Sequence, residues 1–371
     1  MFSFFITSGL FLGWSLGAND ASNVFGTAVA SRMIKFRTAA IWCSIFVILG
    51  AVIGGAGTSE TLGQLGSVNA LAGAFITALS AAFSVYLMTK AGFPVSTSQA
   101  VVGAIVGWNF FAHLPVDTTA LVKITMTWLF CPLLSGAFAV VFYLISARVI
   151  TQCRLHMFTL DYCTRWSMLV AGIFGSYALG ANNIANVMGV FISVSPFETI
   201  QLGPLSFSPA QQLFFIGSLA IALGVATYSK KVMMTVGTGI VDLSPVAACT
   251  VVWSHSIVLF LFSSQELEAL LIGHGLPSIP LVPVSSSQAI VGAVMGIGLL
   301  KTGFRGIKWK MVGSIASGWI TTPIIAAVIC FISLFFLQNV FQQEVYKPDS
   351  QPKTQMETII PRPVPLEVFM E

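Results

Sequence analysis

The sequence predicts an all-α polytopic membrane protein built from two repeats of opposite topology. Of its 371 residues, 56% are hydrophobic and only 8% are charged, whereas a soluble domain usually carries about 25% charged residues. The mean hydropathy is +0.89. Apolar stretches of about 18 residues or more recur along the whole chain, which is the pattern of transmembrane helices. Two short motifs each occur twice and in the same order, which indicates that one half duplicates the other.

Ten apolar segments are the candidate spans. Several contain Gly, Pro and polar residues, so we expect some to be broken helices or re-entrant hairpins, with 10–12 transmembrane helices in total. The segments are residues 3–30, 38–57, 69–89, 94–111, 120–147, 167–192, 210–229, 245–264, 283–300 and 311–337.

The distribution of Lys and Arg predicts the orientation. Thirteen of the 17 basic residues fall in one set of connections, and cytoplasmic loops are enriched in basic residues. Both termini are therefore expected on the extracytoplasmic side of the cell (inner or plasma) membrane. No positive charge precedes Arg32, so the N-terminal segment is expected to be a retained span and not a secretory signal.

The chain divides into four predicted parts. Residues 1–150 form the first membrane repeat, residues 151–166 a cytoplasmic linker and residues 167–338 the second, inverted repeat. Residues 339–371 are Pro-rich and charged, which predicts a disordered polar tail that transport does not need.

Several functional classes find no support in the sequence. The six cysteines form no CxxC pair, and neither a disulfide framework nor a metal site is indicated. An HExxH motif is absent, and the four histidines are scattered, so an intramembrane enzyme is not expected. No long basic run suggests a nucleic-acid partner. No cofactor is expected beyond a coupling cation.

The repeated motifs are closely similar in sequence. Residues 16–26 read LGANDASNVFG and residues 179–189 read LGANNIANVMG, while residues 94–107 read PVSTSQAVVGAIVG and residues 283–296 read PVSSSQAIVGAVMG. Each half holds five predicted spans, and an odd number turns the second copy the other way up in the membrane. Inverted repeats with interrupted helices at the midplane are typical of secondary transporters.

The first motif places a carboxylate, Asp20, inside an apolar span. Such a group costs about 2.5–3.5 kcal/mol even on insertion scales, so it is expected to face a cavity, a partner or a bound cation. Asn19 and Asn23 lie one helical turn apart, and Gly17 and Gly26 favour local unwinding. Carboxylate, amide and backbone oxygens together suit an alkali cation. The alternative is that the Asn side chains only bond one packed helix to another.

The second copy keeps the amides of Asn182 and Asn186 but has Asn183 at the position of the acid. The two halves therefore cannot form equivalent cation sites. Only Asp20 can exchange a proton or neutralise a cation outright.

The second motif predicts a helix start inside the membrane in each half. Both copies fit the capping-box pattern S/T-x-x-Q, so an ordinary helix start is one interpretation. The other is an anion site, because free N–H groups and the helix dipole attract anions and the hydroxyls add donors. Two such starts at one midplane cavity would surround a tetrahedral oxyanion. The residues are Ser96, Thr97, Ser98 and Gln99 in the first copy and Ser285, Ser286, Ser287 and Gln288 in the second.

Two further polar residues leave alternatives open. Asp242 precedes Pro245 near a predicted membrane boundary and is either a helix cap or a ligand. His255 lies in the middle of a predicted span, where it is either a proton relay or a neutral, hydrogen-bonded histidine.

With these four motifs in this order, residues 10–335 resemble the inorganic phosphate transporter (PiT) family. The resemblance implies symport of inorganic phosphate with Na⁺ or H⁺ through an inverted-repeat fold with re-entrant hairpins. By position, it implies that the Ser, Thr and Gln residues of 96–99 and 285–288 bind phosphate. It also implies that Asn19, Asp20, Asn23, Asn182, Asn183 and Asn186 shape the cation and substrate cavity.

The sequence departs from the family pattern in places. Many members have Asp where Asn183 stands and His where Gln99 and Gln288 stand. The missing acid leaves the number of coupled cations open, and it leaves sulfate as the alternative oxyanion. A passive anion channel is a third alternative. The expected partners are phosphate, the coupling cation and the lipid bilayer, with a homodimer left open.

Overall fold

A computed structural model describes residues 2–91, 95–154, 156–203, 205–239, 241 and 243–348. The first half contains α1 (Phe2–Phe5), α2 (Thr7–Asn19), α3 (Ala21–Ala30), α4 (Phe36–Gly54), α5 (Ala56–Leu65), α6 (Leu71–Ala91), α7 (Thr97–Phe111) and α8 (Thr118–Cys153). The second half contains α9 (Met157–Met188), η1 (Gly189–Val194), β1 (Ile200–Leu202), β2 (Leu205–Phe207), α10 (Pro209–Gly239), α11 (Pro245–Leu261), α12 (Gln265–Gly273), α13 (Ser286–Thr302), η2 (Gly303–Gly306) and α14 (Trp309–Asn339).

Helix starts follow capping residues that the sequence supplies. Asp117 Oδ1 accepts hydrogen bonds from the backbone N–H groups of Thr119 (2.8 Å) and Ala120 (3.1 Å) at the start of α8. The Ser264 hydroxyl accepts from Leu267 N at 3.2 Å at the start of α12. These bonds satisfy N–H groups that have no partner within the helix.

Seven helices among the described residues are long and apolar enough to cross a membrane, or eight if α11 and α12 count as one span bent by 68°. The seven are α4, α6, α8, α9, α10, α13 and α14. The other three of the ten predicted segments hold shorter or broken helices: α2 with α3, the 15-residue α7, and α11. The all-α polytopic class with interrupted helices is therefore confirmed.

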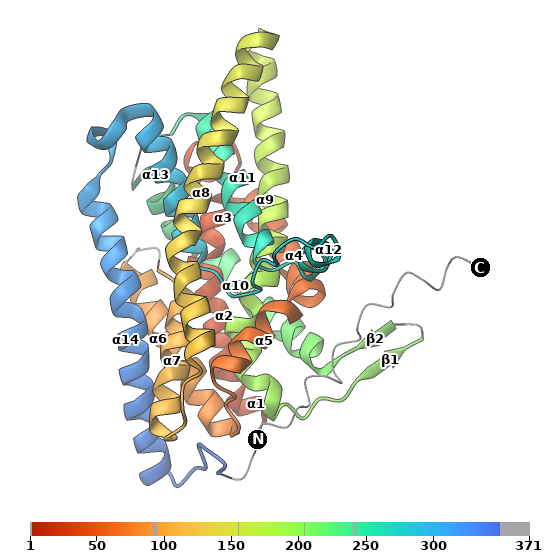
Figure 1. Cartoon of the computed structure of the whole chain (residues 1–371), viewed down its shortest axis with the longest axis vertical. Helices are drawn as coiled ribbons and strands as arrows, with labels where there is room; N and C mark the ends of the chain where they lie inside the picture. Colours follow the sequence, from red (N-terminus) through yellow and green to blue (C-terminus); the bar gives the residue numbers. More distant parts are fainter. Residues whose placement is uncertain are drawn as a thin grey trace.

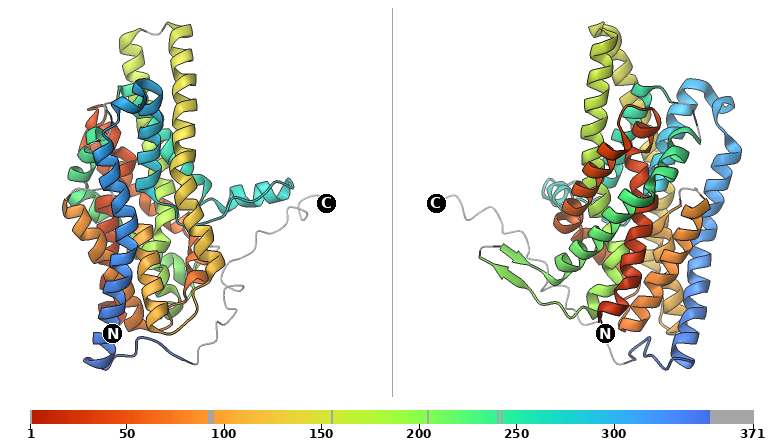
Figure 2. Two further views of the ribbon diagram at one scale, coloured as in Figure 1. Left: turned by 60° about the vertical axis from the view of Figure 1, so that its left-hand side comes forward. Right: turned by 180° about the vertical axis from the view of Figure 1, so that it is seen from behind.

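Two pairs of helices form helical hairpins. Helices α6 and α7 occupy the lower half of the bundle in Figure 1, and α11 and α13 occupy the upper half, with the same arrangement in both views of Figure 2. The starts of α7 and α13 meet at the middle of the molecule. A helix start at this depth is tolerated because it is enclosed by protein and away from lipid.

The repeated motifs make matching contacts in the two halves. A Cβ placed at Gly103 of α7 would lie 2.2 Å from Pro323 O of α14, and a Cβ at Gly292 of α13 would lie 2.1 Å from Pro132 O of α8. Both positions therefore need glycine to let two helices approach closely. Each hairpin thus packs on the last helix of the other half, while the inverted orientation of the halves stays a prediction.

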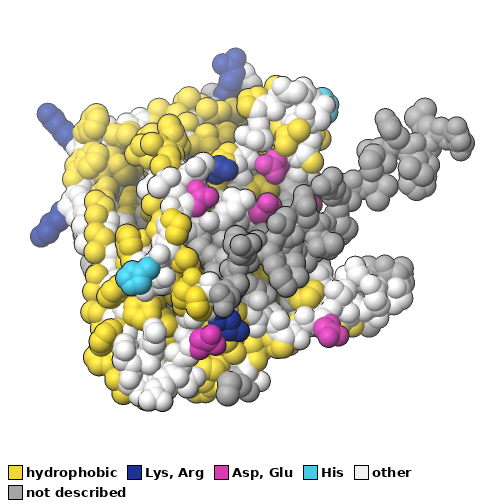
Figure 3. All heavy atoms as spheres, turned by 60° about the horizontal axis from the view of Figure 1, so that its bottom comes forward, with side chains coloured by type: hydrophobic (Ala, Val, Ile, Leu, Met, Phe, Trp, Pro, Cys, Tyr) yellow, Lys and Arg dark blue, Asp and Glu magenta, His cyan; other side chains and the backbone are white. Residues whose placement is uncertain are grey.

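The outer surface fits a membrane environment. In the most apolar 18-residue stretch of both α8 and α14, only 22% of the residues are buried inside the protein, and hydrophobic side chains cover much of the flank in Figure 3. The connections α3–α4, α8–α9 and α13–α14 lie at the upper end of Figure 1, while the N-terminus and the end of α14 lie at the lower end. The first described residues and the end of α14 are therefore on one side; which side is cytoplasmic stays a prediction from the basic residues.

The predicted linker and tail differ from the structure. Within residues 151–166, α8 continues to Cys153 and α9 begins at Met157, so the linker is a short turn between two projecting helices, with Arg154 in a left-handed conformation (φ 45°). A helix can continue past the membrane because its own hydrogen bonds satisfy its backbone.

The first residues of the predicted disordered tail are packed against α6 and α7. Trp108 Nε1 donates to Val345 O at 3.1 Å, and Lys347 N donates to Asn69 Oδ1 at 3.1 Å. Val345 is 1% exposed. Disorder beginning at residue 339 is therefore wrong for this stretch, because the side chains of Trp108 and Asn69 hydrogen-bond to its backbone. Residues 349–371 lie outside the described residues.

Candidate functional site

Asp20 lies at the break between α2 and α3. The interruption is confined to one residue, and Asp20 keeps helical dihedral angles (φ −76°, ψ −35°). Its N–H donates to Leu16 O at 2.7 Å, and Asn23 N donates to Asp20 O at 3.0 Å. The last bond spans three residues instead of the usual four, so the helix tightens at Asp20 without opening. Gly17 has a packing role here, since a Cβ at this position would lie 2.0 Å from Ile221 O of α10.

The second copy of this motif is not interrupted. Helix α9 continues from Met157 to Met188 and passes through all three asparagines of the motif. This copy is therefore not one of the interrupted segments that the sequence led us to expect. An unwound backbone is not needed here, because an Asn side chain of the intact helix α9 already reaches the hairpin of the first half.

The helices α7 and α13 start alike. Ser96 Oγ accepts from Gln99 N at 3.2 Å, and Ser285 Oγ accepts from Gln288 N at 3.2 Å. The predicted serine caps are thus confirmed. The reciprocal bond of the capping box, from the cap N–H to the Gln side chain, does not form, because Gln99 Oε1 and Gln288 Oε1 are buried without a hydrogen-bond partner.

The two helix starts are joined through Ser98. Its hydroxyl donates to Val284 O, which precedes the cap of α13, at 3.1 Å. Asn186 Nδ2 donates to Ser98 Oγ at 2.9 Å and to Asn183 Oδ1 at 3.0 Å. One hydroxyl from the first half therefore connects the second hairpin with α9.

Ser286 forms a second junction on the other side of the site. Asn23 Nδ2 donates to Ser286 Oγ at 3.2 Å, and Ser286 Oγ donates to Asp20 O at 3.4 Å. His255 Nε2 lies 3.0 Å from the same hydroxyl. The donor in the histidine contact depends on the tautomer of the ring, since the Ser286 hydroxyl has one proton for Asp20 O and for His255 Nε2. Nδ1 is buried and has no partner.

His255 belongs to the site although the binding motifs do not include it. The signal in the sequence is a histidine in the middle of an apolar span, and the structure favours the hydrogen-bonded interpretation. Asp242, the other residue left open, lies outside the described residues.

Asn19 and Asn182 hold the segments that precede the helix starts. Asn19 Oδ1 accepts from Val95 N at 3.3 Å, and its amide donates to Thr89 Oγ1 at 2.9 Å. In the second half, Asn182 Nδ2 donates to Val282 O at 3.3 Å. These two asparagines therefore position the hairpins.

All fourteen predicted site residues are brought together in the buried centre, and none is more than 5% exposed. The Thr97 hydroxyl faces the Asp20 carboxyl group, although neither Thr97 Oγ1 nor Asp20 Oδ1 has a hydrogen-bond partner within 3.5 Å. Seven side-chain oxygens of the site are buried without a partner: those of Asp20, Asn23, Thr97, Gln99, Asn182, Asn186 and Gln288. An unpaired buried polar atom costs about 1–3 kcal/mol, so such a concentration indicates a place for bound species.

The site offers two kinds of binding group. Carboxylate and amide oxygens are hard acceptors that suit an alkali cation or the hydrogen-bond donors of a substrate. The first N–H groups of α7 and α13 point into the same region and suit an anion. No Lys or Arg lies among these site residues. Among the described residues, no three or more His, Cys, Asp or Glu side chains are grouped to hold a metal ion.

Comparisons with known proteins agree with this architecture. A model of the phosphate transporter family matches residues 16–330 and again 278–361. A protein of Methanocaldococcus jannaschii named "Putative phosphate permease" is 27% identical over 323 residues, which cover 87% of this chain and 93% of that protein. A permease with the same description from Pyrococcus furiosus is 25% identical over 409 residues, covering 88% and 94%.

One solved structure, described as the sodium-dependent phosphate transporter, has the same fold. Its TM-score is 0.66 at 22% identity, and the match covers 91% of this chain and 99% of that one. Together with the family match over most of its length, this shows that the chain belongs to the phosphate transporter family, whose members are membrane transporters and not enzymes.

Proposed function

We propose that this chain carries inorganic phosphate into the cell by symport with Na⁺ or H⁺. The observation that carries the proposal is the meeting of two helix starts, through Ser98 and Val284, inside a cluster of unpaired oxygens. Membership of the phosphate transporter family and the names of the relatives support phosphate as the substrate.

The helix starts supply the anion-binding groups. The N–H groups of Thr97 and Ser98 begin α7, and those of Ser286 and Ser287 begin α13, so no helical carbonyl precedes them. Hydroxyls on the same residues add donors. Binding by dipoles and neutral donors is moderate, which suits an anion that must be released on the other side of the membrane.

The unpaired oxygens supply the cation-binding groups. Asp20 is the only carboxylate among the fourteen predicted site residues, and the amide oxygens of Asn23 and Asn186 are also without partners. A cation bound to these oxygens would offset the negative charge of phosphate a few ångströms away. Coupling would follow, because each ion would favour the binding of the other.

Phosphate fits the site better than sulfate. At neutral pH phosphate carries at least one O–H group, which can donate to an unpaired acceptor such as Asp20 Oδ1, Gln99 Oε1 or Gln288 Oε1. Sulfate has no proton to donate. A site with many unpaired acceptors therefore discriminates against an analogue that lacks donors.

Burial of the site favours a carrier over a passive channel. The hydroxyls and amides at the two helix starts are at most 5% exposed, so the site does not open to both sides at once in this structure. Alternating exposure of a closed central site is how secondary transporters work.

Uptake into proteoliposomes tests the proposal. Radiolabelled phosphate uptake is measured with an inward Na⁺ gradient, with an inward proton gradient and with neither, and then with excess unlabelled sulfate. We expect accumulation with one of the gradients, collapse when an ionophore dissipates it, and little competition by sulfate. Equal uptake without a gradient would indicate a channel, and strong inhibition by sulfate would indicate the alternative substrate.

A further inference from the structure

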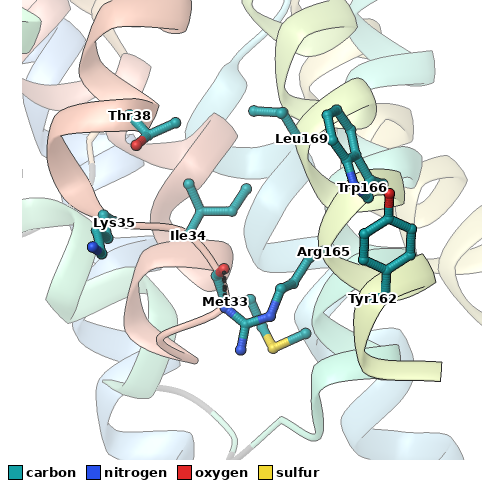
Figure 4. A pocket seen from close by; sticks show the side chains of 8 residues that line it. All are labelled: Met33, Ile34, Lys35, Thr38, Tyr162, Arg165, Trp166 and Leu169. Carbon is teal, nitrogen blue, oxygen red and sulfur yellow. Dashed lines mark hydrogen bonds between the residues drawn. The ribbon is translucent and has the colours of Figure 1, made fainter. Parts of the chain in front are cut away.

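A pocket of about 330 Å³ lies away from the transport site, between the α3–α4 connection and α9 (Figure 4). Lys35 and Thr38 lie on the α4 side of the pocket, and Tyr162 and Trp166 lie on the α9 side. The complete lining is Met33, Ile34, Lys35, Thr38, Tyr162, Arg165, Trp166 and Leu169.

The pocket combines an apolar wall with two basic side chains. Ile34 and Leu169 face each other across it in Figure 4, whereas Lys35 and Arg165 contribute positive charges. Its other polar groups are the Thr38 hydroxyl on the α4 side and the Tyr162 phenol and Trp166 indole on the α9 side. A small soluble anion would leave the apolar wall exposed to water, whereas an amphipathic anion would cover both parts.

The guanidinium of Arg165 is fixed in place. Its Nη1 donates to Met33 O at 3.0 Å, and its Nε donates to Asp161 Oδ2 at 2.8 Å. The Lys35 ammonium group has no ion-pair or hydrogen-bond partner in the described part of the chain. Arg32 lies in the same connection, and Arg37 lies in the first turn of α4. Asp161 pairs with Arg165, so Arg32, Lys35 and Arg37 leave a surplus of positive charge on this part of the chain.

The pocket lies at the depth where helices leave the membrane. Lys35 directly precedes α4, which is long and apolar enough to span. Tyr162 and Trp166 are one helical turn apart on α9, 62% and 53% exposed, with ring centroids 6.3 Å apart. Exposed Tyr and Trp side chains are enriched at the level of lipid head groups.

We propose that this pocket binds an anionic phospholipid from the leaflet on the side of the basic connections. The phosphate of the head group lies at Lys35 and Arg165, an acyl chain covers Ile34 and Leu169, and the indole of Trp166 packs beside the glycerol region. Basic pockets between transmembrane helices bind anionic lipid head groups in this way.

The bound lipid joins two helices that carry transport residues. Arg165 already bonds α9 to the turn after α3, and a lipid phosphate at the same place adds a second bridge between them. Helix α3 begins beside Asp20, and α9 carries Asn183. We therefore expect the lipid to stabilise the folded transporter without contacting the transport site, and the inference does not depend on which ions are transported.

Lipid titration of the purified full-length protein tests this inference. In neutral detergent, dioleoylphosphatidylglycerol and dioleoylphosphatidylcholine are added separately, and retained lipid is counted by native mass spectrometry together with the melting temperature. We expect one retained phosphatidylglycerol and a higher melting temperature than with phosphatidylcholine. In Lys35→Gln, phosphatidylglycerol should bind about fivefold more weakly. The matched control is Lys310→Gln, which removes the same charge at the same end of the molecule and should bind as the wild type does.

A second measurement locates the lipid. Phosphatidylglycerol with brominated acyl chains should quench part of the tryptophan fluorescence of the wild type, and Trp166→Phe should lose that part. Equal binding of the two lipids, equal weakening in Lys310→Gln, or quenching unchanged in Trp166→Phe would each overturn the inference. Displacement of the lipid by millimolar inorganic phosphate would instead identify a soluble-anion pocket and would also overturn it.

Discussion

The hydroxyl of Ser98 donates to the carbonyl oxygen of Val284 at 3.1 Å, although the two residues are 186 positions apart in the chain. The same hydroxyl accepts from Asn186 Nδ2 at 2.9 Å. Ser98 therefore holds the start of α7 against the segment before α13 and against α9. If the two hairpins move relative to each other during transport, these bonds are among the first that must break.

Replacement of Ser98 by Ala should affect both stability and transport. The change leaves the Asn186 amide and the Val284 carbonyl without this partner in a buried region, at a cost of about 1–3 kcal/mol. The melting temperature should fall, and the KM for phosphate should rise by roughly tenfold or more. Ser96→Ala is the matched comparison, because the Ser96 hydroxyl is used as a helix cap and its loss should cost only about 1 kcal/mol of stability. A larger rise in KM for Ser96→Ala than for Ser98→Ala would contradict these roles.

Replacement of Asp20 by Asn should abolish gradient-driven uptake while the protein remains folded in the membrane. The substitution keeps the size of the side chain and removes the single carboxylate of the motif residues, so a bound cation loses its full countercharge. The readout is initial-rate uptake in proteoliposomes, with the amount of inserted protein measured separately. Asn183→Asp, which adds an acid at the matching position of the second copy, should remain active and should change the cation dependence. Normal gradient-driven uptake by Asp20→Asn would exclude the cation role.

Replacement of His255 by Ala should weaken phosphate transport through Ser286. The Ser286 hydroxyl would lose its contact with Nε2, and removal of the imidazole would leave an empty, less polar space beside it. We expect KM to rise several-fold, because the loss of a hydrogen bond that orients a binding hydroxyl costs about 0.5–1.5 kcal/mol. His255→Gln can still donate a hydrogen bond and should recover part of the affinity. If both variants keep the wild-type KM, the histidine only fills space.

Truncation should separate the packed part of the C-terminal segment from the remainder. A stop after residue 348 keeps Val345 and Lys347 and should leave stability and uptake unchanged. A stop after residue 341 removes the acceptor for the Trp108 indole and the partner of Asn69, and should lower the melting temperature measurably. Equal melting temperatures for the two truncated proteins would show that these contacts do not contribute to stability.

Much of the fold could be predicted because membrane insertion imposes strong rules on sequence. Long apolar stretches identify the helices, and polar motifs inside them identify the site, since unpaired polar groups are costly in a bilayer. Thus Asp20, the Asn residues of both motif copies and the hydroxyls of residues 96–98 and 285–287 all lie in the buried centre. The extent of each break was not predictable: the helix tightens at Asp20 by a single residue, and α9 is continuous. Whether a helix stays intact or unwinds at a given residue depends on how its neighbours pack against it, and a short motif does not specify that packing.

The sequence by itself determined the class of protein, the positions of the helix starts and the set of polar residues that the chain buries, because each follows from hydropathy and capping over a few turns of helix. Only the tertiary structure decided which of those groups pair with each other. It joined Ser98 to Val284, brought His255 to Ser286, and left Asp20 Oδ1 and Gln99 Oε1 unpaired. The reason is that hydrogen bonds between distant segments depend on distances of a few tenths of an ångström, and those distances are set by how all the helices pack.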